Sequence, residues 1–172
     1  KENVKEILLS EALPSLARLI ADEFMPPTGV PSELLKIDFP SLERKMFGRI
    51  NMVVNFTSDE RKKDVYTREE FYALVEQKLS DSYEFKGKLF GDEQIREIER
   101  WVMLQTIDQE WKDHLLSLDH LRDGIGLRGY GQRDPLQEYK REALELFKRM
   151  VTSIKQHSLE ALFRVQPNLA ER

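Results

Sequence analysis

Apolar residues recur every three or four positions over two long stretches in the second half of the chain. The first stripe comprises Trp101, Leu104, Ile107, Trp111, Leu115, Leu118 and Leu121, and the second comprises Leu136, Tyr139, Ala143, Leu146, Phe147, Met150, Ile154 and Leu162. This spacing places each set along one side of an α-helix. The pattern predicts one helix from Asp92 to about Asp123 and another that begins at Asp134 and Pro135, since proline suits the first helical position. Two helices joined by a short connection form an antiparallel hairpin, with arms roughly 40 Å long.

Both stripes are expected to pack the hairpin together and against neighbouring helices. The residues expected to contribute most to this packing are Trp101, Trp111, Leu115, Leu118, Tyr139 and Phe147. Aromatic side chains of this size dominate packing energetics, and truncation of a buried one costs about 3–5 kcal/mol. We therefore expect both tryptophans to be buried.

The N-terminal stretch also has helical spacing, with apolar positions from Val4 to Ile20. Pro14 should kink or divide this helix, because proline lacks the backbone N–H and its ring meets the preceding turn. Two prolines and a glycine within residues 25–29 should end it.

Shorter helices are expected in the middle of the chain. Ser41 is a candidate N-cap for a helix over 42–55, and Thr67 with Glu70 forms a capping-box pattern for a helix over 68–80. Residues 51–56 could form a strand on their β-branching, but no partner strand is evident. Gly91 and a loop over 86–88 are a plausible hinge. The fold class that these patterns predict is all-α.

A glycine-rich connection lies between the two predicted arms. Its four glycines and the proline that follows them are Gly124, Gly126, Gly129, Gly131 and Pro135. Glycine allows a tight reversal, but a turn needs no apolar, cationic and aromatic residue beside it. We therefore interpret Leu127, Arg128, Gly129 and Tyr130 as a contact site for a partner. An ordinary surface turn is the alternative.

The same glycines match a dinucleotide-binding pattern in their spacing. That chemistry requires a strand before the glycines and a helix that starts among them, so that the pyrophosphate meets free N–H groups. Here a helix precedes the glycines, and the next helix cannot begin before about Asp134. A nucleotide role for these glycines is therefore not expected.

Composition excludes several classes of function. The net charge of −4 argues against a general nucleic-acid binder, which needs a basic face. The chain has no cysteine, so disulfides and thiolate metal sites are excluded. No apolar run reaches the roughly 20 residues that span a bilayer. The sequence begins in a helical pattern without Met, which indicates a fragment of a longer protein.

The sequence offers little for catalysis. Among the three histidines, His114 and His120 are six positions apart and cannot chelate a metal from one helix face. No nucleophile in a strained turn accompanies them, and no G-x-x-x-x-G-K-[ST] phosphate loop occurs. We expect no catalytic residue, no metal and no bound cofactor in this chain.

Four segments resemble the C-terminal region of SecA, the ATP-driven motor of bacterial preprotein translocation. They are Leu104–Leu115 (LQTIDQEWKDHL), Leu118–Arg122 (LDHLR), Gly124–Pro135 (GIGLRGYGQRDP) and Gln137–Glu142 (QEYKRE). The resemblance is continuous from about Trp101 to Gln166 and looser upstream. It implies that residues 1–24 end a long scaffold helix, 25–90 form a helical wing, 91–166 form a two-helix finger and 167–172 start a tail.

The resemblance also implies a role. In the family the finger lies beside the channel entrance, and its tip, where the aromatic matches Tyr130, contacts the translocating polypeptide. The hairpin is held to restrain the motor ATPase until channel and substrate bind. The implied partners are an unfolded preprotein, the Sec membrane channel and the SecA motor domains, and the implied location is the cytoplasmic face of the cell membrane, without a transmembrane segment. ATP and Mg belong to motor domains that these residues lack, as does the zinc-binding tail. A purely structural helical adaptor with an inert tip is the alternative.

Overall fold

The computed structural model describes residues 4–25, 34–59, 62–128 and 134–167. Its helical elements in chain order are α1 (Val4–Ile7), the π-helical turn η1 (Leu8–Ala12), α2 (Leu13–Asp22), α3 (Phe39–Ile50), α4 (Arg68–Phe90), α5 (Asp92–Arg128) and α6 (Pro135–Arg164). Leu35 and Tyr66 form an isolated antiparallel bridge, and the described residues contain no strand. The predicted all-α fold is confirmed.

Pro14 disturbs the N-terminal helix, as predicted. The π-helical turn η1 directly precedes it, and the N–H of Leu13 donates to the carbonyl of Leu8, five residues earlier. A proline cannot donate to the carbonyl four residues before it, so the regular α-helical ladder is interrupted there. A π-helical turn accommodates this interruption without ending the helix.

Helix α3 starts earlier and ends earlier than expected. Asp38, and not Ser41, is the N-cap: its carboxylate accepts hydrogen bonds from the Ser41 N–H at 3.3 Å and from the Ser41 hydroxyl at 2.6 Å. Asn51 adopts a left-handed conformation with φ of 53° and closes the helix, so the prediction of a helix to Asn55 is wrong. Residues 51–56 are irregular, and the possible strand does not form.

Helix α4 begins as predicted and continues further. The Thr67 hydroxyl accepts from the Glu70 N–H at 3.2 Å, and the Glu70 carboxylate accepts from the Thr67 N–H at 3.0 Å, which confirms the capping box. The helix runs beyond Ser80 to Phe90, so the expected loop at 86–88 is helical instead. Gly91, with φ of 83°, ends α4, and α5 starts at the next residue.

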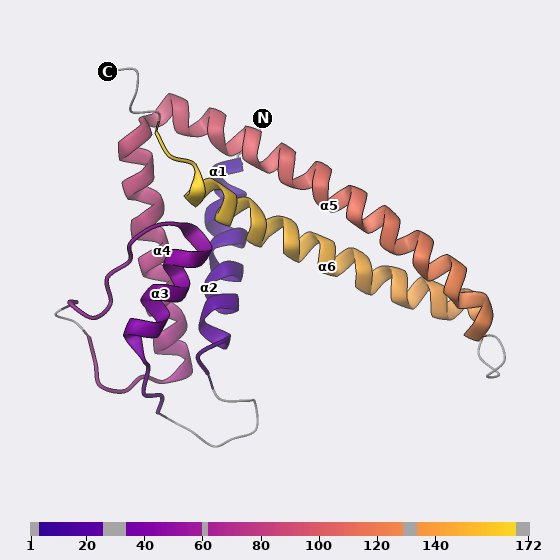
Figure 1. The fold of residues 1–172 in the computed structure, drawn as a ribbon, viewed down its shortest axis with the longest axis horizontal. Coiled ribbons are helices and arrows are strands. Elements are labelled where there is room, and N and C mark those ends of the chain that lie inside the picture. The colour runs from indigo at the N-terminus through magenta and orange to yellow at the C-terminus, as the bar shows by residue number, and fades with distance from the viewer. Residues whose placement is uncertain (1–3, 26–33, 60–61, 129–133, 168–172) are drawn as a thin grey trace.

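One hydrophobic core joins the helical body to the base of the hairpin. Its fully buried large side chains include Phe56, Phe71, Phe163, Leu8, Leu16, Ile20, Leu42, Met46, Ile50, Leu79, Ile95 and Leu159. These residues come from the N-terminal helix, from α3, α4 and the loop between them, and from the base ends of α5 and α6. Figure 1 shows α2, α3 and α4 gathered into a body, from which α5 and α6 run side by side to a distant end. The predicted hairpin is confirmed, and its base is part of the body core.

Candidate functional site

The hairpin is the element that sequence analysis singles out for function, and its arms are longer than expected. Helix α5 has 37 residues and α6 has 30, which at 1.5 Å per residue gives about 55 Å and about 45 Å. Asp92 and Glu93 occupy the first turn of α5, where negative charge suits the helix dipole. Asp134 caps α6 through a 2.9 Å hydrogen bond from the Leu136 N–H, with Pro135 at the first position as predicted.

At the far end of the hairpin, α5 continues into the glycine-rich segment. The helix includes Gly124 and Gly126 and ends at Arg128, so the expected end near Asp123 is wrong. These two glycines lie in the last turns of the helix, not in the connection between the arms. A Cβ atom at Gly124 would meet nothing within 4 Å, so close packing does not require glycine there.

The structure describes only part of the predicted contact segment. Leu127 and Arg128 belong to the last turn of α5, while Gly129, Tyr130 and Gly131 lie outside the described residues. The side chains of Leu127 and Arg128 also lie outside the description. The contact role of the segment therefore stays a prediction.

The described charges near this end are solvated. Arg122 is exposed and contacts two acidic neighbours on its own helix, Asp119 at 3.2 Å and Asp123 at 3.7 Å. Exposed pairs of this kind contribute well under about 1 kcal/mol. Arg122 is thus locally compensated, and it does not by itself make the end cationic.

The predicted packing residues are less buried than expected. The exposed fraction is 61% for Trp101, 47% for Trp111, 45% for Leu115 and 46% for Phe147, whereas Leu118 and Tyr139 are half-buried. The expectation that both tryptophans are buried is therefore wrong. The buried residues where α5 meets α6 and the body include Val102, Met103, His114, Met150 and Ser158.

A buried histidine lies between the two arms at mid-length. The ring of His114 is 5.7 Å from that of Trp111 on its own helix and 6.0 Å from that of Phe147 on α6. Nearby, His157 Nδ1 on α6 is 2.6 Å from Glu110 Oε1 on α5. These polar and aromatic contacts between the arms could not be predicted from the sequence, because no local pattern shows which residues of two helices face each other.

Large apolar side chains remain exposed along one flank of α5. They are Trp101, Leu104, Ile107, Trp111 and Leu115, spaced three or four residues apart, and we call them the α5 flank. Helical spacing places them on one side of the helix, next to the buried seam. Large apolar patches on protein surfaces are typical of interaction sites, so the α5 flank is a second candidate surface.

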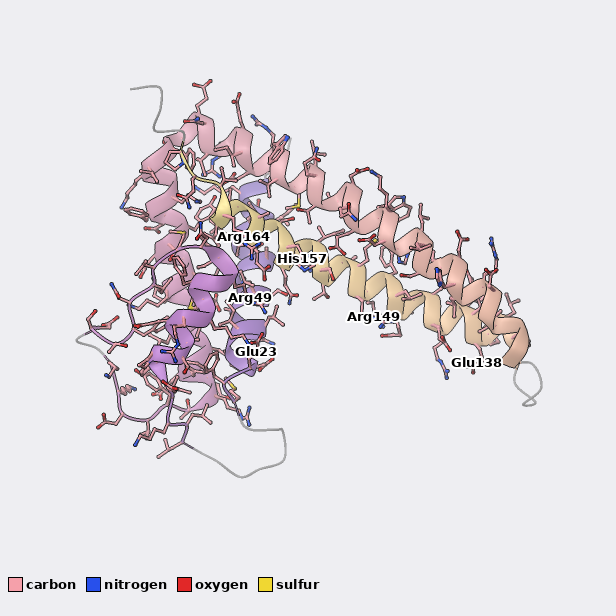
Figure 2. The ribbon with its side chains drawn as sticks, in the orientation of Figure 1. Glu23, Arg49, Glu138, Arg149, His157 and Arg164 are labelled. Atoms are coloured by element: carbon pink, nitrogen blue, oxygen red, sulfur yellow. The ribbon has the colours of Figure 1, made fainter. Side chains whose placement is uncertain are left out.

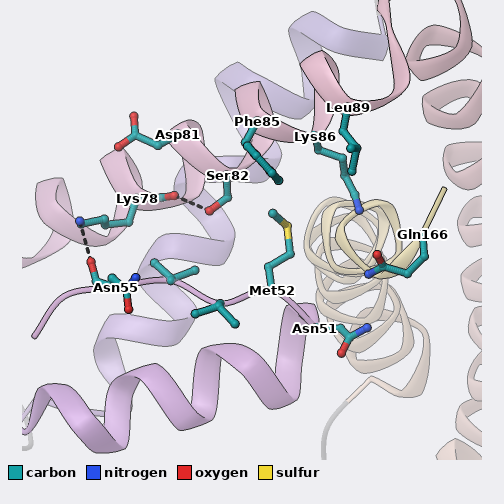
Figure 3. Close-up of a pocket in the computed structure, with 12 residues that line it drawn as sticks. Asn51, Met52, Asn55, Lys78, Asp81, Ser82, Phe85, Lys86, Leu89 and Gln166 are labelled. Atoms are coloured by element: carbon teal, nitrogen blue, oxygen red, sulfur yellow. Dashed lines mark hydrogen bonds between the residues drawn. The ribbon is translucent and has the colours of Figure 1, made fainter. Parts of the chain in front are cut away.

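Elsewhere the body carries a groove of about 510 Å³ between residues 51–55 and α4. Figure 3 shows its lining, where Met52 and Phe85 lie near Lys86, whose amine points toward the end of α6. The lining contains no nucleophile paired with a base. Within the described ranges, no group of three or more His, Asp or Glu side chains is placed to hold a metal ion.

None of the helices in the described ranges combines the length and the apolarity that crossing a bilayer requires.

Comparison with known proteins identifies a family that matches this chain. The sequence matches the family described as "SecA Wing and Scaffold domain" over residues 2–166. The chain is 36% identical over 162 residues to the protein translocase subunit SecA of Koribacter versatilis, a match that covers 94% of the chain and 16% of that protein. It is 50% identical over 103 residues to the protein translocase subunit SecA of Geobacter sulfurreducens, covering 60% of the chain and 12% of that protein.

The chain thus spans about a sixth or less of the length of these relatives. The family match covers all of the helices described above, including both arms of the hairpin. Together, these matches show that the chain belongs to the SecA wing and scaffold domain family.

Proposed function

We propose that this chain works as part of a preprotein translocase motor, and that its hairpin contacts the translocating polypeptide. The observation that carries the proposal is the long hairpin, α5 with α6, that projects from the body of a SecA wing and scaffold domain. Helical arms anchored in a core transmit displacement between base and tip, which a flexible loop does not. The contact residues of the proposal are Leu127, Arg128, Gly129 and Tyr130, with the Sec membrane channel as a second partner.

The chemistry of this segment suits a moving substrate. An aromatic ring and a cation can each hold an unfolded chain with about 1 kcal/mol and without sequence preference. Weak contacts release as readily as they form, so a polypeptide can slide past them. A tight, specific site would hold the substrate in place.

The proposal assigns the remaining parts of the chain as follows. Residues 1–24 end a scaffold helix, 25–90 form the wing, 91–166 form the finger and 167–172 begin a tail. ATP and Mg bind motor domains outside these residues, and the hairpin restrains their hydrolysis until substrate and channel are engaged. The chain itself has no catalytic role and binds no cofactor. The assembled motor lies at the cytoplasmic face of the cell membrane.

Tyr130→Ala in the full-length motor tests the proposed contact. We expect reduced preprotein transport into membrane vesicles with basal ATP hydrolysis largely unchanged, because the substitution removes a contact and leaves the nucleotide site intact. Tyr130→Phe, which keeps the ring, is the matched control and should retain most transport. Full transport by Tyr130→Ala would refute the proposed contact.

The second candidate is a structural adaptor that docks by the α5 flank and has an inert tip. The exposed apolar side chains of that flank favour it, because they have no cover within the described residues. In that case Trp111→Ala would disturb assembly of the motor, and Tyr130→Ala would change nothing. The two proposals therefore differ in which aromatic residue transport depends on.

A further inference from the structure

We propose that the last turn of α6 is a joint clamped from two sides, which makes α3, α4 and the hairpin one rigid lever. The joint consists of residues 159–165, where the return arm of the hairpin enters the body. This proposal concerns mechanics, and it does not depend on what the tip contacts.

The first side of the clamp is a lysine of α4. Lys86 is 3% exposed, and its amine donates to the carbonyl of Phe163 at 2.8 Å and to that of Val165 at 2.5 Å. The last carbonyls of a helix have no partner within the helix, and a cation placed there also meets the negative end of the helix dipole. Lys86 therefore caps α6 from a different helix.

The second side of the clamp is formed with α3. Arg49 contacts Glu160 of α6 at 2.8 Å and Glu23, just after α2, at 3.0 Å. In return Arg164 of α6 donates to the carbonyl of Arg49 at 2.9 Å and to that of Gly48 at 3.3 Å. Figure 2 shows Arg49 and Arg164 near each other at the base of the hairpin, with Glu138 far along α6. Each helix end thus supplies a side chain that binds the other helix.

Buried apolar side chains also hold the joint in place, between the two sets of polar contacts. Leu159, Leu162 and Phe163 have no exposed surface and belong to the body core. Rotation of α6 about its last turn would have to move these side chains through a close-packed interior, where volume changes are costly. The core therefore resists the same motion that the polar bonds resist.

Helix α5, the other arm of the hairpin, is held by the same face of α4. Tyr83, three residues before Lys86, donates its hydroxyl to Glu99 of α5, and Arg96 contacts Glu99 at 2.6 Å. Glu99 is 1% exposed, so its charge is satisfied by these two partners inside the body. Residues three apart lie on one side of a helix. One stretch of α4 thus holds both arms at their bases.

These contacts imply that the angle between α4 and the hairpin is fixed. The distant end of α6, at Pro135, lies about 36 Å from the start of the joint at residue 159, so a small rotation at the base would become a large displacement at the far end of the hairpin. The contacts on both sides of residues 159–165 prevent that rotation. Force on the tip is then passed to α3 and α4 and is not lost at a hinge near Gly91.

Two spin labels can measure this angle directly, because the chain has no native cysteine. Glu76→Cys on α4 and Lys140→Cys far along α6 are exposed positions with the joint between them. The variant carries Lys86→Met and Arg49→Met, which remove the Lys86 contacts and the ion pair between Arg49 and Glu160, while the contacts of Arg164 with backbone carbonyls remain. Lys88→Met, an exposed lysine of the same helix, is the matched control.

We expect a narrow distribution of distances between the labels in the parent and in Lys88→Met. In the double variant the distribution should become about twofold wider, because local openings follow the loss of tertiary contacts. An unchanged width in a double variant with the parent's helix content overturns the proposal. If the double variant loses helix content, exposed Arg164→Met decides instead for the α3 side, because it removes the contacts with the carbonyls of Gly48 and Arg49: broadening supports that side of the joint, and an unchanged width overturns it.

Discussion

At the scale of single residues, the chain uses charged side chains at buried positions. Lys86 lies inside the body, and burial lowers its pKa from 10.5 to about 8. A neutral amine still has two N–H groups, which matches the two carbonyls that Lys86 contacts. The lysine can therefore keep both hydrogen bonds after it loses its proton.

This pKa predicts how stability depends on pH. Because the pKa of Lys86 is lower in the folded chain than in the unfolded chain, the folded chain binds fewer protons between about pH 8 and 10.5. The free energy of unfolding should rise with pH across this window, by at most about 1.4 kcal/mol per pH unit. Urea unfolding of the parent and of Lys86→Met, at about pH 7 and about pH 9.5, measures the difference.

The variant serves as the control in that experiment, since all other titrating groups are shared. The increase in the free energy of unfolding with pH should be smaller in Lys86→Met than in the parent, because the variant lacks this amine. Burial also raises the pKa of Tyr83, so the folded chain holds that proton longer and stability falls again at still higher pH. The same pH dependence in parent and variant would contradict the role of burial at Lys86.

Residues such as Lys86, Glu99 and His114 could not be identified from the sequence as buried. Each is a polar residue in a helix rich in polar residues, and its burial depends on which distant residue it meets. The two tryptophans show the opposite case, in which large apolar residues are exposed. Trp101 and Trp111 are large and regularly spaced, but the seam between the arms runs beside them through smaller or polar side chains.

At the scale of elements, several features that depend on residues close in sequence were predicted. The capping box at Thr67, the interruption at Pro14 and the start of α6 at Pro135 all follow from backbone donors and acceptors close in sequence. Helix ends were predicted less well. Asp38 was missed as the cap of α3 because Ser41, which it binds, is itself a good capping residue.

Glycines misled the prediction at the far end of α5. Glycine is a poor helix former by about 1 kcal/mol, which favoured an end near Asp123. The helix nevertheless continues to Arg128, so the low helix propensity of glycine does not set its end. The contacts between α5 and α6 cannot be predicted from the sequence of either helix alone.

The capping box supplies a prediction for α4. Thr67→Ala should lower the free energy of unfolding by about 1 kcal/mol, because it leaves the Glu70 N–H without its acceptor. Thr152→Ala is the matched control: that hydroxyl contacts the carbonyl of Lys148 within α6 and caps nothing. Urea unfolding monitored by circular dichroism should show a loss only for Thr67→Ala. Equal losses in both variants would contradict the capping role.

At the scale of the whole molecule, one core ties the hairpin base to the body, and the rest of the hairpin projects from it (Figure 1). This arrangement explains why the sequence predicted a hairpin but could not predict its anchoring. The stripes define the arms, whereas the joint is built from residues more than 70 positions apart, such as Lys86 and Phe163. The α5 flank is exposed in this chain, and the relatives that the chain matches are several times longer than it is.

Site-specific crosslinking during translocation tests the central claim most directly. A photo-crosslinking residue is placed at position 130 of the full-length motor, with position 116, an exposed leucine on α5, as the control. We expect the probe at position 130 to capture the translocating polypeptide or the channel, and the probe at position 116 to capture far less. Equal or absent capture at position 130 would contradict a substrate-contacting finger.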